Sequence, residues 1–157
     1  MSRWPAGEAE IERLLDQREL ERVTANSDLA DRLPQQANDH LRTAEAAADS
    51  DPTGAYQLAY DAARKGCAAT LAVTGLRATR SGGHIAIRSA ALAQFRAARG
   101  GEALTKFDVM RRRRQEAEYP DERADLITTS EAVDAIEWAE AIVALVRTAM
   151  PHLRPWQ

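Results

Sequence analysis

Four consecutive arginines, Arg111 to Arg114, are the part of the sequence best suited to chemistry, and Gln115, Tyr119 and Pro120 follow them. An arginine guanidinium keeps its charge in proteins and can bind a phosphate through two parallel N–H bonds. A tyrosine hydroxyl can donate to a phosphate, and the tyrosine ring can stack on a base. These residue types therefore predict a site for an anionic ligand, with phosphate or RNA as the natural class.

A helix predicted over residues 103–118 has to position this run, and its apolar residues cluster on one side. Arg114 falls in the middle of that side, and Arg111 lies at its margin. Arg112 and Arg113 are expected to point away from it, toward solvent. The apolar residues that define the side are Leu104, Phe107, Met110 and Ala117.

A guanidinium on a buried face is costly unless its charge meets a partner. Glu118 lies one helical turn after Arg114 and could form an internal ion pair with it. The other interpretation is that Arg114 binds a phosphate. Pro120 disfavours a helical conformation at Tyr119, so the helix should end near Glu118 and the tyrosine ring could fold back toward Arg114.

The other elements are also predicted to be helices, because apolar residues recur at steps of three and four and no segment alternates with period two. Pro34 suits a first helical turn, Gly75 is a plausible helix stop, and the residues from Thr128 to Glu131 match a capping box. Cys67 lies among alanines and reads as a small core residue. The predicted helices cover about residues 8–25, 34–49, 53–75, 84–99, 103–118 and 128–150.

Short loops between long helices favour an all-α, up-down helical bundle with an additional N-terminal helix. Residues 1–26 are assigned to a polar accessory segment and residues 27–157 to the bundle. The accessory helix is read either as solvated or as a contact for a partner. Its thin apolar line consists of Ile11, Leu14, Leu15 and Val23.

The composition fits one globular, soluble, cytoplasmic domain of 157 residues with a net charge of −3, so any RNA contact must come from a local basic patch. No stretch is long and apolar enough to cross a membrane. One cysteine and three scattered histidines offer no zinc set, and no cofactor is expected. His84 follows two glycines and is read either as a capping or packing residue or as a base, whereas His40 and His152 have no supporting motif.

The block RRRRQEAEYPD after ALTKFDVM resembles the motif region of HEPN domains. The earlier stretch AYQLAYDAARKGCAATLAVTGLRATRSGGHIAI resembles their central helix pair, and the similarity covers roughly residues 34–150. It is closest to small stand-alone actinobacterial HEPN proteins. The resemblance implies a helical bundle that forms a homodimer, and an activity as a metal-independent endoribonuclease of a toxin–antitoxin or phage-defence system. Some members are paired with a minimal nucleotidyltransferase.

The family motif is an arginine, a polar residue, a few variable positions and a histidine. By this resemblance Arg114 and Tyr119 are the catalytic positions, while Arg111, Arg114 and Gln115 bind the RNA phosphate. Tyr119 replaces the histidine, and a phenol with an ordinary pKa near 10 is a poor base at neutral pH. Three hypotheses stay open: a ribonuclease, a catalytically inactive module that binds RNA, a nucleotide or a partner such as an antitoxin, and a purely structural helical domain.

Overall fold

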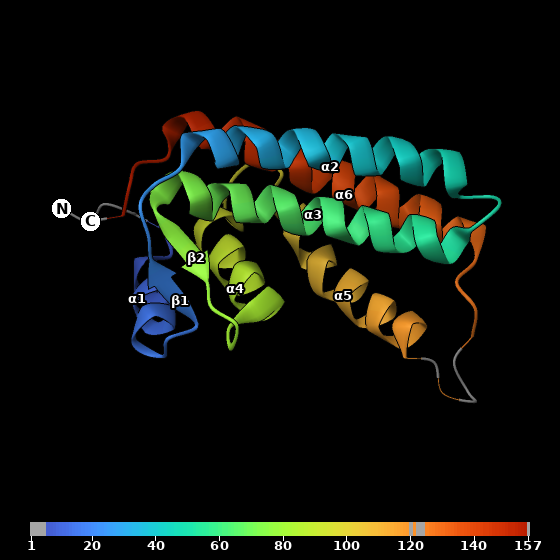
Figure 1. Ribbon diagram of the computed structural model, residues 1–157, viewed down its shortest axis with the longest axis horizontal. Coiled ribbons are helices and arrows are strands. Elements are labelled where there is room, and N and C mark those ends of the chain that lie inside the picture. The colour runs from blue at the N-terminus through green and yellow to red at the C-terminus, as the bar shows by residue number, and fades with distance from the viewer. Residues whose placement is uncertain (1–5, 120, 122–124, 157) are drawn as a thin grey trace.

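The computed structural model describes residues 6–119, 121 and 125–156, and within them the chain is an all-α bundle with one small two-stranded sheet. Three long helices, α2, α3 and α6, run along the length of the molecule (Figure 1). Helix α2 runs opposite to α3 and α6, which are parallel to each other, and α5 runs opposite to α6 (Figure 1). The long helices α2, α3, α5 and α6 thus alternate in direction along the chain, and the predicted all-α, up-down bundle is confirmed. The helices are α1 Glu8–Asp16, α2 Ser27–Ala47, α3 Pro52–Thr74, α4 Gly83–Phe95, α5 Thr105–Glu118 and α6 Thr129–Ala149.

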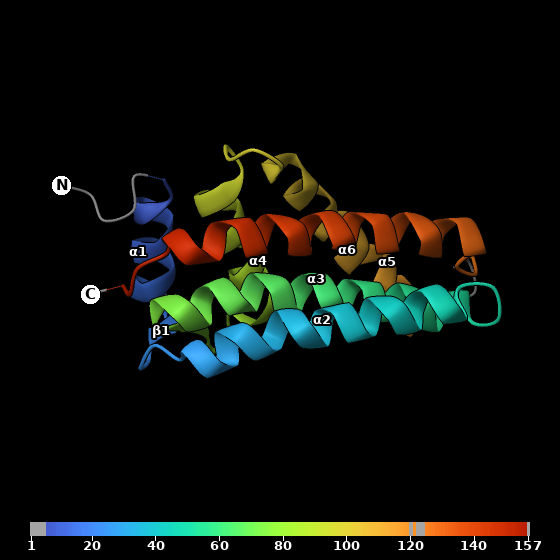
Figure 2. The same cartoon turned by 90° about the horizontal axis from the view of Figure 1, so that it is seen from above.

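Helix α3 is the centre of the bundle and packs against α2 and α6 (Figure 2). Small residues on α3 allow this close approach, as their spacing predicts. At Gly66 an added Cβ would lie 3.4 Å from a methyl group of Val143 on α6. The buried small residues of α3 include Ala55, Ala59, Ala62, Ala63, Gly66, Cys67 and Ala69.

Helices α4 and α5 pack on α3 on the side away from α2 (Figure 1). The short 3-10 turn Gly101–Leu104 leads into α5, and a second one, Met150–His152, follows α6. Phe107 and Met110 of α5 are fully buried in the common core, as the helical wheel predicts. This packing fixes the face of α5 that carries Arg114.

The prediction of one helix over residues 8–25 is wrong at its second half. Helix α1 ends at Asp16, Arg18 takes a left-handed φ of 58°, and the chain enters strand β1, Leu20–Arg22. This strand pairs antiparallel with β2, Leu76–Ala78, so Leu20 lies opposite Ala78. The pairing partner lies far along the chain, and a strand of three residues is too short to show a period of two.

The apolar line of α1 lies inside the molecule, since Ile11 and Leu14 are fully buried and α1 packs on α4. Helix α2 begins earlier than predicted because the Asn26 side chain accepts a hydrogen bond from the backbone N–H of Leu29 at 2.9 Å. Pro34 therefore lies inside the helix rather than in its first turn, which corrects the prediction.

Two predicted helix signals are confirmed. Gly75 ends α3 with a φ of 74°, and a Cβ there would lie 2.9 Å from the carbonyl oxygen of Val23. Thr128 and Glu131 form the full capping box at the start of α6. Among the described residues no helix is long and apolar enough to cross a membrane.

Candidate functional site

The four arginines of α5 occupy different environments. Arg112 is exposed, with 73% of its side chain accessible, as predicted. Arg111 and Arg114 are partly buried, at 23% and 28%. Arg113 is the most buried of the four at 17%, so the prediction that it points to solvent is wrong.

Arg113 is buried because α6 begins beside it. Its Nε donates to Glu131 at 2.8 Å, and its Nη2 donates to the carbonyl oxygen of Asp125 at 3.0 Å. A helical wheel of α5 alone cannot place the neighbouring helix start. Arg113 therefore holds the last turn of α5 to the capping box of α6.

Arg114 makes the ion pair that was one of its two interpretations, together with a contact to α3 that the sequence did not predict. Its Nη1 forms an ion pair with Glu118 at 3.1 Å, as predicted for a partner one turn ahead. Its guanidinium carbon also lies 5.4 Å from the ring centroid of Tyr60 on α3, a cation–π contact. These two contacts orient the guanidinium, yet more than a quarter of the side chain stays accessible to a ligand.

His84 lies in the first turn of α4 and reaches back to α3. Its Nδ1 is 2.8 Å from the hydroxyl of Tyr60, and the two rings lie 5.7 Å apart. Tyr60 thus contacts both His84 and Arg114. It is the residue that connects α3 to the two other helices at this point.

Electrostatics keep His84 neutral and Tyr60 protonated near pH 7. Burial and the positive charges of Arg64 and Arg114 lower the pKa of His84, against the opposing effect of Asp61. Burial raises the pKa of Tyr60 to about 12, although Arg114 and Arg64 act in the opposite direction. A neutral imidazole beside a guanidinium is a group that can accept a proton from a bound substrate.

Arg114 and His84 together line two adjacent hollows. The inner hollow has a volume of about 400 Å³ and the outer one about 360 Å³. The inner hollow is also lined by His40, Gly54, Gln57, Leu58, Tyr60 and Asp61. The outer hollow is also lined by Ile85, Arg111, Gln115, Glu118 and Tyr119. The predicted residues Arg111, Arg114, Gln115 and Tyr119 therefore do meet in one place.

Asp61 organises the opposite wall of the inner hollow. Its Oδ2 lies 3.1 Å from Nε2 of His40 and 3.3 Å from Nζ of Lys65, and its Oδ1 accepts from Nε of Arg64 at 3.0 Å. Burial acts to raise the pKa of Asp61, but the hydrogen bond and charge of Arg64 and the charge of Lys65 outweigh it and lower the pKa. Asp61 is therefore a carboxylate that orients the His40 ring.

Tyr119 ends α5 with a non-helical φ of −125° and ψ of 66°, as expected for this position. Pro120, to which the sequence attributed this ending, lies outside the described residues. Tyr119 lines the outer hollow beside Arg114, but it is 74% exposed. It lies at the rim of the site rather than deep within it.

Asp108 restrains the other arginines around the outer hollow. Burial acts to raise the pKa of Asp108, yet a hydrogen bond from Arg111 and the charges of Arg88, Arg111 and Arg112 outweigh it and lower the pKa. Arg111 donates to Asp108 through Nε and Nη2, both at 3.1 Å. This pairing holds Arg111 at the margin of the hollow.

The sequence did not reveal Tyr60 or the pairing of His40 with Asp61, and it gave His84 two possible roles. Tyr60 and His84 do lie in the block that resembles HEPN domains, which was the one available signal. Cys67 is buried and its pKa is raised to about 12 by that burial, which agrees with its prediction as a core residue. Within the described ranges, no cluster of three or more histidine, cysteine or acidic side chains could hold a metal ion.

No protein-family model, no curated protein and no solved structure matches this chain. The arrangement of Arg114, His84 and Tyr60 is thus the basis on which its function is inferred.

Proposed function

We propose that this chain is an RNA-directed protein of HEPN type that cleaves RNA as a metal-independent endoribonuclease, as in toxin–antitoxin or phage-defence systems. One observation supports it most: the Arg114 guanidinium and the neutral His84 imidazole line the same two hollows. A phosphate-binding cation next to a proton acceptor is what transfer of a phosphoryl group to a ribose 2′-hydroxyl requires.

Arg114 is proposed to bind the phosphate to be cleaved. A guanidinium has five N–H donors, and the ion pair with Glu118 uses Nη1. The remaining donors suit a bidentate contact with two phosphate oxygens. Gln115 and Arg111 lie along the same hollow and would bind a neighbouring phosphate or sugar.

His84 is proposed to act as the general base, in place of Tyr119. When its Nδ1–H donates to the Tyr60 oxygen, Nε2 carries the lone pair that can accept the proton of the 2′-hydroxyl. The 2′-oxygen then attacks phosphorus. Tyr119, exposed at the rim, suits stacking on a base of the bound RNA rather than proton transfer.

His40 is proposed to act as the general acid on the other side of the inner hollow. Its Nε2 faces Asp61, which orients the ring as the carboxylate of a catalytic triad does and leaves Nδ1 for proton transfer. The bond from phosphorus to the 5′-oxygen breaks, and that oxygen takes the proton of His40. The products are a 2′,3′-cyclic phosphate and a 5′-hydroxyl.

A second copy of the chain is proposed to complete the RNA-binding surface as a homodimer. Ile85 is 53% exposed and lies with Tyr119 on the outer hollow. An exposed apolar side chain beside an RNA site suits a contact between copies. An antitoxin or a nucleotidyltransferase is proposed as a further partner by the HEPN resemblance.

A catalytically inactive module that binds RNA or a nucleotide is the second candidate. It is favoured by Tyr119, which occupies the motif position of the HEPN histidine, and by the ion pair of Arg114 with Glu118. Such a protein would bind RNA with the salt dependence of phosphate contacts but would not cut it.

The test is cleavage of a single-stranded RNA by the purified protein in excess EDTA, with the product ends identified. Arg114→Ala is expected to slow cleavage by about 10²-fold to 10³-fold, the usual loss of a donor that stabilises transition-state charge. Arg112→Ala, on the same helix but exposed, is the matched control and should cleave normally. RNA binding without cleavage supports the second candidate, and equal cleavage by both variants contradicts the proposed site.

A further inference from the structure

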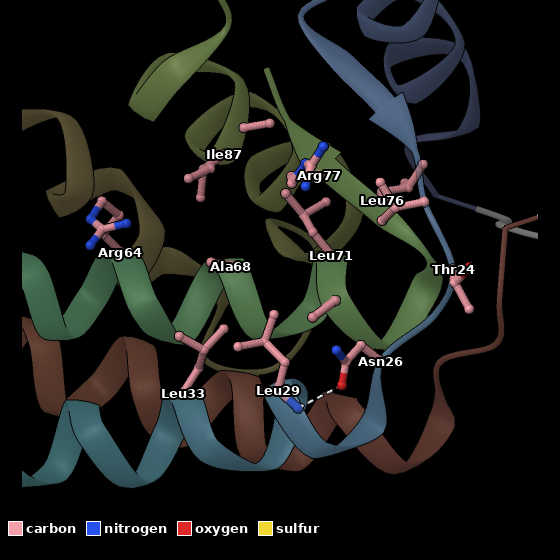
Figure 3. Close-up of a pocket in the computed structure, with 13 residues that line it drawn as sticks. Thr24, Asn26, Leu29, Leu33, Arg64, Ala68, Leu71, Leu76, Arg77 and Ile87 are labelled. Atoms are coloured by element: carbon pink, nitrogen blue, oxygen red, sulfur yellow. Dashed lines mark hydrogen bonds between the residues drawn. The ribbon is translucent and has the colours of Figure 1, made fainter. Parts of the chain in front are cut away.

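A third hollow, separate from the RNA site, lies between the start of α2, the second half of α3, β2 and α4, and it has a volume of about 490 Å³ (Figure 3). This volume is within the range of pockets that hold small molecules, about 300 to 1,000 Å³. Leu29 and Leu33 of α2 and Leu71 of α3 line it, together with Ile87 of α4. Its lining is mainly apolar.

The hollow exists because small side chains line it at positions where large side chains would fill it. Ala68 and Ala72 on α3 and Ala78 on β2 face the leucines of α2. The connection from β1 to α2, tied to α3 by a 2.9 Å hydrogen bond from Asn26 N–H to the carbonyl oxygen of Ala72, closes one end. The cavity is thus built by secondary structure rather than by a loose loop.

Two arginines border this apolar space, Arg64 on α3 and Arg77 on β2 (Figure 3). Each uses the same edge of its guanidinium for an acid: Nε of Arg64 donates to Asp61 at 3.0 Å, and Nε of Arg77 donates to Glu21 at 2.9 Å. In both pairs the second contact is made by Nη2. Among the described residues Nη1 of neither arginine has a hydrogen-bond partner, so both retain donors for an anion.

We propose that this hollow binds a small amphipathic monoanion, with an alkyl chain among the leucines and a carboxylate on the guanidinium of Arg64. The apolar lining accounts for the chain, and the free Nη1 donor of Arg64 at its border accounts for the charge of the head group. A neutral chain would leave the free Nη1 donor of Arg64 without a charged partner. A nucleotide or an RNA phosphodiester, which has no alkyl chain, would leave the leucines uncovered.

Arg64 also connects this hollow to the RNA site, because its partner Asp61 contacts His40. A carboxylate at Arg64 competes with Asp61 for the same guanidinium. Only this consequence rests on the proposed function: an occupied hollow should change the rate of RNA cleavage. Binding itself is independent of RNA and is tested without it.

Titration calorimetry and backbone amide NMR with hexanoate, octanoate and decanoate test the binding. Affinity should rise by about threefold to fourfold per added methylene, since each buried CH₂ contributes about 0.8 kcal/mol. Amide shifts should cluster at residues 29–33, 68–72 and 76–78. Octan-1-ol and octylamine, of equal chain length, should bind at least about tenfold more weakly than octanoate because they lack the anionic head.

Two variants test the contacts of the head group and those of the alkyl chain separately. Arg64→Gln should weaken the binding of octanoate by about tenfold. Arg42→Gln, which breaks a similar pair with Asp39 three residues earlier on the exposed face of α2, is its matched control and should leave binding unchanged. Ala68→Phe should abolish binding by filling the hollow, whereas Ala46→Phe on the exposed face of α2 should not. Circular dichroism checks that each variant folds.

Equal affinities for octan-1-ol and octanoate would contradict the claim that the site recognises an anionic head group. An unchanged octanoate affinity in Arg64→Gln would contradict it as well. Absence of binding by all three carboxylates would overturn the site itself. Amide shifts confined to the residues that line the inner and outer hollows would also contradict a binding site in the third hollow. None of these results depends on whether the protein cleaves RNA, so failure of this proposal is distinct from failure of the proposed function.

Discussion

Nδ1 of His84, in the first turn of α4, lies 2.8 Å from the hydroxyl of Tyr60 on α3, and the Tyr60 ring in turn receives the guanidinium of Arg114 from α5. Three successive helices, α3, α4 and α5, thus bring an imidazole, its hydrogen-bond partner and a cation together. Because Tyr60 is buried, this arrangement is fixed by the core rather than by surface loops. A rigid arrangement of this kind suits proton transfer, which needs defined geometry.

The His84 ring should titrate below the ordinary histidine pKa of 6.5, since burial and the charges of Arg64 and Arg114 both disfavour its charged form. The neutral form then persists to lower pH, and cleavage should fall only as the pH drops through the lowered pKa. Arg114→Gln removes one of the charges and should move the midpoint upward. Histidine ring NMR against pH measures both values, and a wild-type midpoint above 6.5 would contradict the electrostatics described.

Tyr60→Phe keeps the ring that contacts Arg114 and deletes only the hydroxyl that holds His84. We expect a loss in the free energy of unfolding of about 1 kcal/mol, because the partner imidazole is left with one contact fewer. Cleavage should fall by about tenfold as the His84 ring loses its orientation. Urea unfolding and cleavage rates measure the two effects, and an unchanged rate would show that the hydroxyl does not position the base.

Gly82 and Gly83 form a matched pair in the turn that presents His84. A Cβ at Gly82 would overlap the carbonyl oxygen of Glu19, whereas a Cβ at Gly83 would meet nothing within 4 Å. Gly82→Ala should therefore reduce the free energy of unfolding by about 2 to 3 kcal/mol. Gly83→Ala, strained only by its φ of 49°, should cost about 1 kcal/mol. Equal midpoints in urea for the two variants would show that the turn does not pack tightly against Glu19, just before β1.

Arg113→Met tests the connection between α5 and α6. The hydrogen bond from Arg113 holds the pKa of Glu131 below its ordinary value of 4.5, so the pair stabilises the fold above that pH and loses its contribution as the pH falls through the lowered pKa. Glu131 is 38% exposed, and with that screening we expect a loss of about 1 kcal/mol at pH 7. The loss should shrink toward zero as the pH falls through the lowered pKa of Glu131. Arg112→Met is the control, and a loss that stays constant with pH would exclude the ion pair as its cause.

Local signals in the sequence predicted the helices well. Thr128 and Glu131 carry a capping pattern that is complete within four residues, and the glycine at position 75 needs no distant partner to end α3. Two of the failures arise where contact with a distant segment of the chain determines the structure. Strand Leu20–Arg22 depends on pairing with residues 76–78, and the burial of Arg113 depends on where α6 begins.

The candidate site was predicted only in part for the same reason. Arg111, Arg114, Gln115 and Tyr119 lie on one helix or at its end, so their proximity follows from helical spacing. The contact of His84 with Tyr60 joins α4 to α3, and the pairing of His40 with Asp61 joins α2 to α3. Such contacts are set by the packing of the bundle, which residue types and spacing do not specify.

The shared role of Arg114 and His84 is tested most directly by NMR titration of the protein with a single-stranded RNA whose 2′-hydroxyls are replaced by hydrogen, so that it binds but cannot be cut. We predict that the His84 ring and the Arg114 Nε–H resonances shift together with one dissociation constant, and that Arg114→Ala weakens this binding while Arg112→Ala does not. Shifts at Arg112 with none at His84, or binding that is equal in the two variants, would contradict a phosphate site between Arg114 and His84.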